Sequence, residues 1–121
     1  MKKILLIEDD PFLIDIYTTK LEDSGFSVEV ATEGEAGLKK LRKEKFDLLI
    51  LDIVLPNVDG WEVLEEIEKE EKFKNLKIIV FSNLGQKEEV EKGLNLGAVK
   101  YFIKAHYTPS EAVEEIKKTL K

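Results

Sequence analysis

The chain contains no cysteine and a single histidine, His106. It can therefore form no disulfide framework, no thiolate zinc site and no cysteine nucleophile, and one histidine cannot build a histidine-rich metal site. Long hydrophobic runs are also missing. Only four apolar residues follow Met1-Lys2-Lys3 before the acids begin, too few for a signal peptide or a membrane span. We therefore expect a cytoplasmic protein with no membrane partner.

Positive charge is scarce as well. Lysine and arginine together number 19 against 25 aspartates and glutamates, which gives a net charge of −6. Nucleic-acid binding requires a local excess of basic side chains, so we expect no direct nucleic-acid partner. The 121 residues, 43% of them hydrophobic, are enough for one domain with a real core, residues 1–121, and too few for two ordinary ones.

Short apolar runs alternate with longer amphipathic ones along the whole chain. The runs predict five strands, at Lys3–Ile7, Ser27–Ala31, Asp47–Asp52, Leu76–Phe81 and Val99–Ile103. The segments between them predict five helices: from Pro11 to about Ser24 after an Asp10 cap, from a Thr32-x-x-Glu35 capping box to about Lys45, from near Asp59, from about Gln86 to Leu96, and after a Thr108-Pro109-Ser110-Glu111 capping box. This alternation predicts an α/β fold with a parallel sheet covered on both faces.

Residue patterns also suggest an order for the strands. Ser27–Ala31 alternates polar and apolar residues, as an edge strand does, whereas the runs at 4–7, 48–51 and 78–81 are apolar throughout and fit central positions. An edge position for the second strand favours the order 2-1-3-4-5, which is that of a flavodoxin-like, doubly wound sheet of five strands with five helices.

Polar side chains follow four of the predicted strands. Glu8 and Asp9 come after the first, Asp52 ends the third, Ser82 follows the fourth and Lys104 the fifth. Ligands of such sheets bind outside the carboxyl ends of the strands, where the strand order reverses. Helix capping can explain any one of these residues, but it does not predict that all four strand ends carry complementary polar groups. We expect them to converge on one rim.

Three converging carboxylates, those of Glu8, Asp9 and Asp52, would repel one another unless a hard divalent cation lies between them. Oxygen ligands suit Mg²⁺, and the backbone carbonyl of Val54 is a candidate fourth ligand. Asp52 can then act as a nucleophile toward phosphorus and form an acyl phosphate. Lys104 and the Ser82 hydroxyl are candidates to neutralise the phosphoryl oxygens.

These residues carry a resemblance that extends over essentially the whole chain. The pair Glu8-Asp9, the segment Leu51-Asp52-x-x-Leu55-Pro56-x-x-Asp59-Gly60, Ser82 and Lys104 have the order and spacing of receiver domains of two-component response regulators, including the single-domain chemotaxis type. The resemblance implies that a sensor histidine kinase phosphorylates Asp52 and that Glu8, Asp9, Asp52 and the Val54 carbonyl hold Mg²⁺. It also implies that Ser82 and Tyr101 form a switch that repacks the face of the last two helices and the last strand.

The chain departs from the family pattern at several positions. Ala105 follows Lys104 where the family has a proline joined by a cis bond, and a cis bond without proline costs roughly 2.5–4 kcal/mol. The bond is therefore strained or trans. Asn83 occupies a position where a small residue is usual. Val54 and Leu84 lie where side chains govern water access to the acyl phosphate, and both are apolar, which predicts slow self-dephosphorylation.

Three other classes of protein can be compared with a phosphoacceptor domain. An aspartyl phosphatase would need a second acid two residues after Asp52, where Val54 stands, and a flavin module would need a phosphate-binding loop in place of Asp9-Asp10-Pro11-Phe12. The strongest rival is a phosphorylation-independent interaction domain on the same fold. We expect no enzyme beyond self-phosphorylation and self-dephosphorylation. The output would be an unknown protein or a missing effector domain, and the chain a monomer or a phosphorylation-linked dimer.

Overall fold

A computed structural model describes every residue of the chain, Met1–Lys121. Five strands alternate with five α-helices and two short 3-10 helices. The strands are β1 (Lys3–Ile7), β2 (Ser27–Ala31), β3 (Leu48–Leu51), β4 (Lys77–Ser82) and β5 (Lys100–Ile103). The α-helices are α1 (Pro11–Asp23), α2 (Gly34–Lys43), α3 (Gly60–Lys69), α4 (Lys87–Asn95) and α5 (Pro109–Thr119), and the 3-10 helices are η1 (Glu71–Phe73) and η2 (Lys104–His106). None of the helices has the length and apolar character needed to cross a bilayer.

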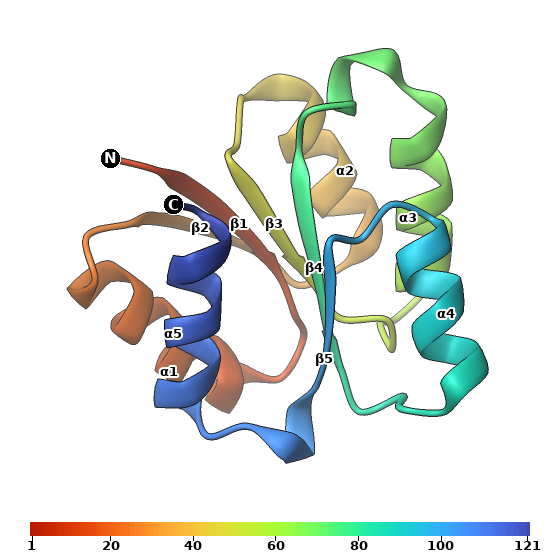
Figure 1. The fold of residues 1–121 in the computed structure, drawn as a ribbon. Helices are drawn as coiled ribbons and strands as arrows, with labels where there is room; N and C mark the ends of the chain where they lie inside the picture. The colour runs from red at the N-terminus through yellow and green to blue at the C-terminus, as the bar shows by residue number, and fades with distance from the viewer.

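The strands form one parallel sheet in the order β2-β1-β3-β4-β5. Helices α1 and α5 cover one face of this sheet, and α2, α3 and α4 cover the other (Figure 1). The flavodoxin-like fold predicted from the sequence is confirmed, and so is the edge position of β2. The order reverses between β1 and β3, and sheets of this topology bind their ligands at the carboxyl ends of the strands at such a reversal.

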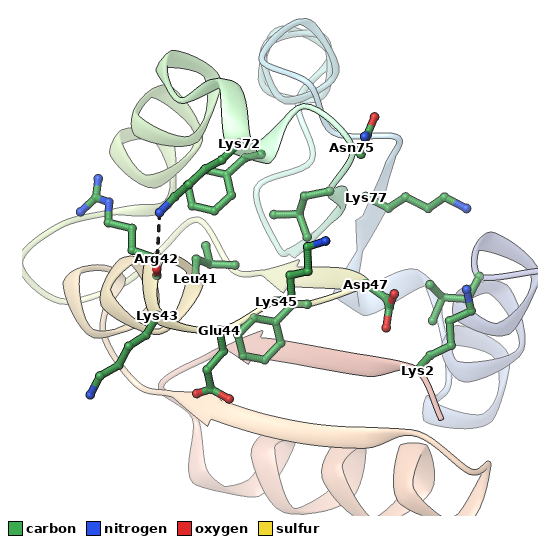
Figure 2. Close-up of a pocket in the computed structure, with 14 residues that line it drawn as sticks. Lys2, Leu41, Arg42, Lys43, Glu44, Lys45, Asp47, Lys72, Asn75 and Lys77 are labelled. Carbon is green, nitrogen blue, oxygen red and sulfur yellow. Dashed lines mark hydrogen bonds between the residues drawn. The ribbon is translucent and has the colours of Figure 1, made fainter.

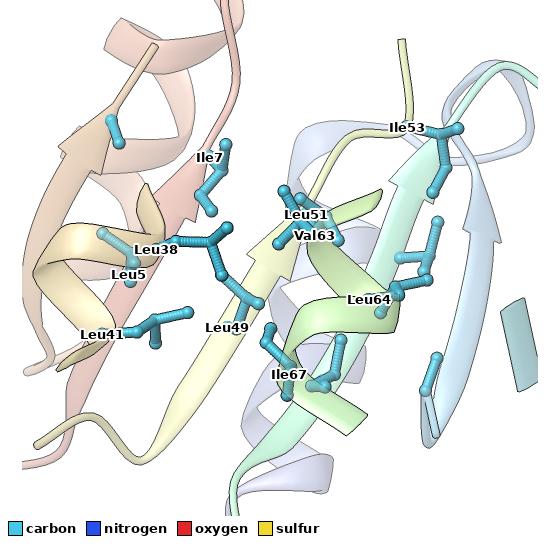
Figure 3. Packing of buried hydrophobic residues seen from close by; sticks show 14 of the residues in the cluster. Leu5, Ile7, Leu38, Leu41, Leu49, Leu51, Ile53, Val63, Leu64 and Ile67 are labelled. Carbon is cyan, nitrogen blue, oxygen red and sulfur yellow. The ribbon is translucent and has the colours of Figure 1, made fainter. Parts of the chain in front are cut away.

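Two hydrophobic cores explain the unbroken apolar runs within the central strands. Side chains of a strand point alternately to its two faces. Leu5 and Ile7 of β1 accordingly pack with α2 and α3, whereas Ile4 and Leu6 pack with α1 and α5. Figure 3 shows the first of these clusters between the sheet and the helices α2 and α3. Each fully buried aliphatic side chain contributes about 1.5–3 kcal/mol, so both faces fix the register of the strands.

Side chains cap three of the predicted helices as expected. Asp10 Oδ1 accepts the backbone N–H of Phe12 at 2.9 Å at the start of α1, and Asp59 Oδ1 accepts that of Glu62 at 3.0 Å at the start of α3. Thr108 and Glu111 form the reciprocal capping box at α5. These caps satisfy backbone donors that have no partner within the helix.

The second helix differs from its prediction. It begins at Gly34, after Glu33, and has no side-chain cap, so the capping box expected at Thr32 is wrong. It ends at Lys43, two residues before the predicted end at about Lys45. A Cβ atom added at Gly34 would lie 2.5 Å from the Val58 carbonyl oxygen. The first turn of α2 thus packs against the loop that contains Val58. The helix starts after Thr32, so its start coincides with this packing and not with the local motif.

Three of the predicted strands have ends that shift by one residue. β3 begins at Leu48 and ends at Leu51, so Asp47 and Asp52 flank it. β4 begins and ends one residue later than expected, at Lys77 and Ser82, and β5 begins one residue later. Just before the strand, the Asp47 carboxylate accepts the backbone N–H of Lys3 at 2.8 Å. Asp52 therefore belongs to the loop that follows β3.

Candidate functional site

The strand register brings the two acidic segments together. Ile7 of β1 pairs with Leu51 of β3, so the next residues along the chain, Glu8 and Asp52, emerge side by side from the sheet. Both carboxylates are buried, with 2% of the Glu8 residue and 5% of the Asp52 residue exposed. Carboxylates this deep are costly unless they are paired or coordinate a cation.

Lys104 supplies the pairing charge. Its Nζ lies 2.7 Å from Glu8 Oε1 and 2.8 Å from Asp52 Oδ2, and 12% of its side chain is exposed. Burial disfavours the charged ammonium, but the hydrogen bonds and charges of Asp52 and Glu8 outweigh this and raise the pKa of Lys104. The lysine is therefore held as a cation between two acids.

Backbone amides hold the Glu8 carboxylate in place. Its Oε2 accepts the N–H groups of Asp9 and Asp10, each at 3.1 Å. Burial nevertheless raises the pKa of Glu8, and the hydrogen bonds from Lys104 and from the Asp10 backbone only partly offset that rise. The role of the Asp10 amide could not be predicted from the sequence, because every residue except proline carries the same donor.

Glu8, Asp9 and Asp52 form a set of oxygen donors suited to a hard cation. One ligand atom from each lies within 4.8 Å of the other two, and Asp9 is exposed while the other two are buried. Three carboxylates near one solvent-facing opening match the ligands that Mg²⁺ prefers. The Val54 N–H donates to Asp52 Oδ1 at 3.3 Å, and the role of the Val54 carbonyl as a ligand stays a prediction.

Ser82 and Tyr101 belong to β4 and β5, the two strands that follow β3 across the sheet. Ser82, at the end of β4, is fully buried, and its hydroxyl accepts the backbone N–H of Leu84 at 3.3 Å. The Tyr101 hydroxyl donates to the Leu84 carbonyl, and its ring lies against Gly93 of α4. Burial, followed by the charges of Glu89 and Asp52, raises the pKa of Tyr101 to about 12. The tyrosine is thus already partly buried beside the loop that follows β4.

The bond after Lys104 is trans. No cis peptide bond occurs anywhere in the chain, and Lys104, Ala105 and His106 form the short helix η2. Lys104 Nζ contacts both Glu8 and Asp52. Ala105, in place of proline, therefore does not prevent these contacts. Of the two alternatives left open for this bond, the structure selects trans.

Similarity to known proteins identifies the family to which these features belong. The family model of the response regulator receiver domain matches residues 4–117. The chain belongs to this family. Receiver domains of response regulators are phosphorylated by histidine kinases, and they bind Mg²⁺ at their acidic pocket.

Two known regulatory proteins resemble the chain along nearly its full length. It is 32% identical over 120 residues to the regulatory protein VanRc of Enterococcus gallinarum, covering 99% of this chain and 50% of that protein. It is 35% identical over 122 residues to the alkaline phosphatase synthesis transcriptional regulatory protein PhoP of Bacillus subtilis, covering 99% and 49%. The chain thus spans about half the length of these relatives.

A solved structure gives the same result. The CheY-like response regulator receiver domain protein from Methanospirillum hungatei superimposes with a TM-score of 0.89 at 34% identity, covering 99% of this chain and 94% of that one. Fold and family therefore agree with the geometry of the acidic site.

Proposed function

We propose that this receiver domain accepts a phosphoryl group on Asp52 from the phosphohistidine of a sensor histidine kinase. The Asp52 carboxylate would form a bond to phosphorus while the bond from phosphorus to the histidine nitrogen breaks and its electron pair returns to the imidazole. The observation that carries the proposal is the position of Asp52, buried at the end of β3 and 2.8 Å from the Lys104 ammonium.

The two oxygens of Asp52 differ in their contacts. Oδ2 is bound by Lys104, whereas Oδ1 accepts only the longer, 3.3 Å bond from the Val54 N–H. Oδ1 is the freer oxygen and the better candidate for attack. Lys104 is then placed to contact an oxygen of the incoming phosphoryl group and to offset its charge.

A divalent cation completes the charge balance of the proposed reaction. Glu8, Asp9 and Asp52, with the Val54 carbonyl, would hold Mg²⁺, which when bound supplies positive charge next to the phosphoryl oxygens. The chain's own residues supply the remainder: Lys104 neutralises charge, and the Ser82 hydroxyl, which accepts the Leu84 N–H, can donate its own O–H to the product.

The output of the switch would run through the face formed by α4, β5 and α5. Tyr101 of β5 connects the site to α4, since its hydroxyl binds Leu84 and its ring lies against Gly93. A shift of Ser82 and the Leu84 segment toward a phosphoryl group would alter both contacts. A partner protein or an attached output domain could read this change, and no substrate outside the phosphorelay would be needed.

Mass spectrometry tests the proposal directly. We expect acetyl phosphate with Mg²⁺ to add one phosphoryl group to the chain, and expect no addition in EDTA. Asp52→Asn should abolish the addition, whereas Asp59→Asn, which changes a nearby capping acid, should leave it intact. A chain that stays unmodified while folded and Mg²⁺-loaded would favour the phosphorylation-independent interaction domain.

A further inference from the structure

A pocket lies at the end of the sheet opposite to the acidic site, where the strands begin. It has a volume of about 650 Å³ and lies between the segment that leads from α2 into β3 and the segment around η1 that leads into β4, with Lys2 and Leu120 at its border. Figure 2 shows this pocket, with Lys45 in its middle between Lys72 and Lys77. Its size falls in the range of small-molecule sites.

The pocket is basic although the chain as a whole is acidic. Six cationic side chains line it against two acidic ones: Lys2, Arg42, Lys43, Lys45, Lys72 and Lys77. Both acids are already engaged by the start of β1, Glu44 by the Lys3 ammonium and Asp47 by the Lys3 amide. The five lysines of this set have no carboxylate within ion-pair distance, whereas Arg42 is paired with Glu66 and Glu70. The Lys72 and Lys77 ammoniums donate to the backbone carbonyls of Arg42 and Thr119, at 3.4 and 2.9 Å, which do not neutralise their charge.

The same pocket has an apolar wall. Phe46, Phe73 and Leu76 line it beside the lysines. Phe73 is nearly buried, whereas Phe46 and Leu76 are partly exposed and can contact a ligand. A molecule that combines an aromatic group with several negative charges would match both surfaces.

Beyond this pocket the acids outnumber the bases on the chain. The outer face of the adjoining α3 carries Glu65 and Glu68, both exposed. An extended polyanion such as nucleic acid would need a continuous track of cations and would meet these acids instead. A compact polyanion fits within the basic area.

From these observations we propose that the pocket binds a nucleoside di- or triphosphate, with the phosphates against the lysines and the base against Phe46 and Leu76. This site is independent of the acidic site that includes Asp52, which lies at the other end of the same strands. Binding needs no step of the proposed phosphorylation.

Calorimetric titration in EDTA at low salt tests this proposal with three probes: ATP, inorganic triphosphate and adenosine. EDTA removes any cation that could draw a phosphate to the acidic site. We expect ATP to bind more tightly than triphosphate, adenosine not to bind, and the affinity for ATP to fall as salt is added. Amide NMR shifts caused by ATP should cluster at residues 42–47 and 72–77.

The double variant Lys2→Ala/Lys45→Ala provides the decisive comparison, because neither side chain makes a hydrogen bond or an ion pair and the fold should be unaffected. We expect its affinity for ATP to fall about tenfold. The matched control Lys39→Ala/Lys87→Ala makes the same charge change outside the pocket and should bind like the parent. Asp52→Asn should also bind ATP normally, which separates this site from the phosphoacceptor.

Several results would overturn the proposal. One is the absence of binding by all three probes; another is equal loss of affinity in the pocket variant and the control. Equal affinity for triphosphate and ATP would contradict the choice of a nucleotide. NMR shifts centred on Glu8, Asp52 and Lys104 would place the ligand at the acidic site.

Discussion

At the scale of single residues, the acidic site depends on one cation held between two buried acids. Lys104 contacts Glu8 and Asp52 at 2.7 and 2.8 Å, and few of the atoms involved reach solvent. A buried ion pair adds little net stability relative to apolar residues, but removing one partner leaves an uncompensated charge. The arrangement is therefore better explained by the chemistry it supports than by stability alone.

Removing the lysine charge tests this balance. We expect Lys104→Met to lower the free energy of unfolding by about 3 kcal/mol at neutral pH in EDTA, because two buried carboxylates then face each other without a cation. Mg²⁺ should restore part of the loss. Denaturant titration measures both effects, and Lys69→Met, at an exposed position of α3, should cost less than about 0.5 kcal/mol. A Lys104 variant as stable as this control would contradict the assigned contacts.

Burial raises the pKa of Glu8 above its ordinary value of 4.5, which makes stability depend on pH. The folded chain then holds the Glu8 proton more tightly than the unfolded chain. The stabilisation is fully present below pH 4.5 and is lost as the pH rises through the raised pKa. In EDTA, Glu8→Gln should therefore lose less unfolding free energy than the parent chain between pH 4.5 and neutrality.

Glu68→Gln provides the control for this pH series, since it removes an exposed glutamate of α3. Its pH profile should follow that of the parent. Matching profiles for the parent chain and Glu8→Gln would show that burial does not perturb Glu8.

Val54 bears on how long the phosphoryl group survives. Its side chain is 59% exposed next to Asp52 and has no polar atom to orient a hydrolytic water. We expect the phosphorylated parent to decay slowly, and Val54→Asn to shorten its lifetime about tenfold, which is below the effect of a full general base. Decay of the phosphorylated mass over time measures this, with Val54→Ile as the apolar control. A parent lifetime of only seconds would contradict the prediction.

At the scale of elements, helix starts show where sequence patterns suffice and where packing overrides them. The Thr108 box is confirmed, since both of its reciprocal hydrogen bonds are present. The similar Thr32 pattern is wrong: α2 begins at Gly34, which packs closely against the Val58 carbonyl, a contact between segments far apart in the chain. A local motif cannot reveal such a contact.

The two threonines yield a paired prediction. Thr108→Ala should lower the free energy of unfolding by about 1 kcal/mol, since the hydroxyl caps α5 by accepting the Glu111 amide at 3.2 Å. Thr32→Ala should change it by less than about 0.5 kcal/mol because α2 has no side-chain cap. Thermal or denaturant unfolding of both variants measures the difference. Equal losses would mean that Thr32 caps its helix after all.

At the scale of the whole molecule, the parallel topology places two sites of opposite charge at the two ends of one sheet. Carboxyl ends gather the acids Glu8 and Asp52, and the amino ends gather lysines such as Lys45. The sequence was sufficient to predict the first, because alternating strands and helices bring all carboxyl ends to one edge. The second was not foreseen, since its basic residues come from α2, η1, β4 and the segments beside them, and no local pattern encodes how these approach one another.

Other features of the candidate site also lay beyond the sequence. The position of Tyr101 depends on the space that Gly93 leaves and on the Leu84 carbonyl, a group common to every residue. The peptide bond between Lys104 and Ala105 is trans, and the sequence did not decide between a trans bond and a strained cis bond. Residue identities and order predicted which groups meet, but not the contacts that orient them.

The most direct test of the central claim is to find which carboxylate carries the phosphoryl group. Borohydride reduces an acyl phosphate to an alcohol, so an aspartyl phosphate becomes homoserine that peptide mass spectrometry can locate. After treatment with a phosphodonor and Mg²⁺, we predict homoserine at position 52 and nowhere else. Homoserine at position 9 or 59, or modification that persists in Asp52→Asn, would contradict the account.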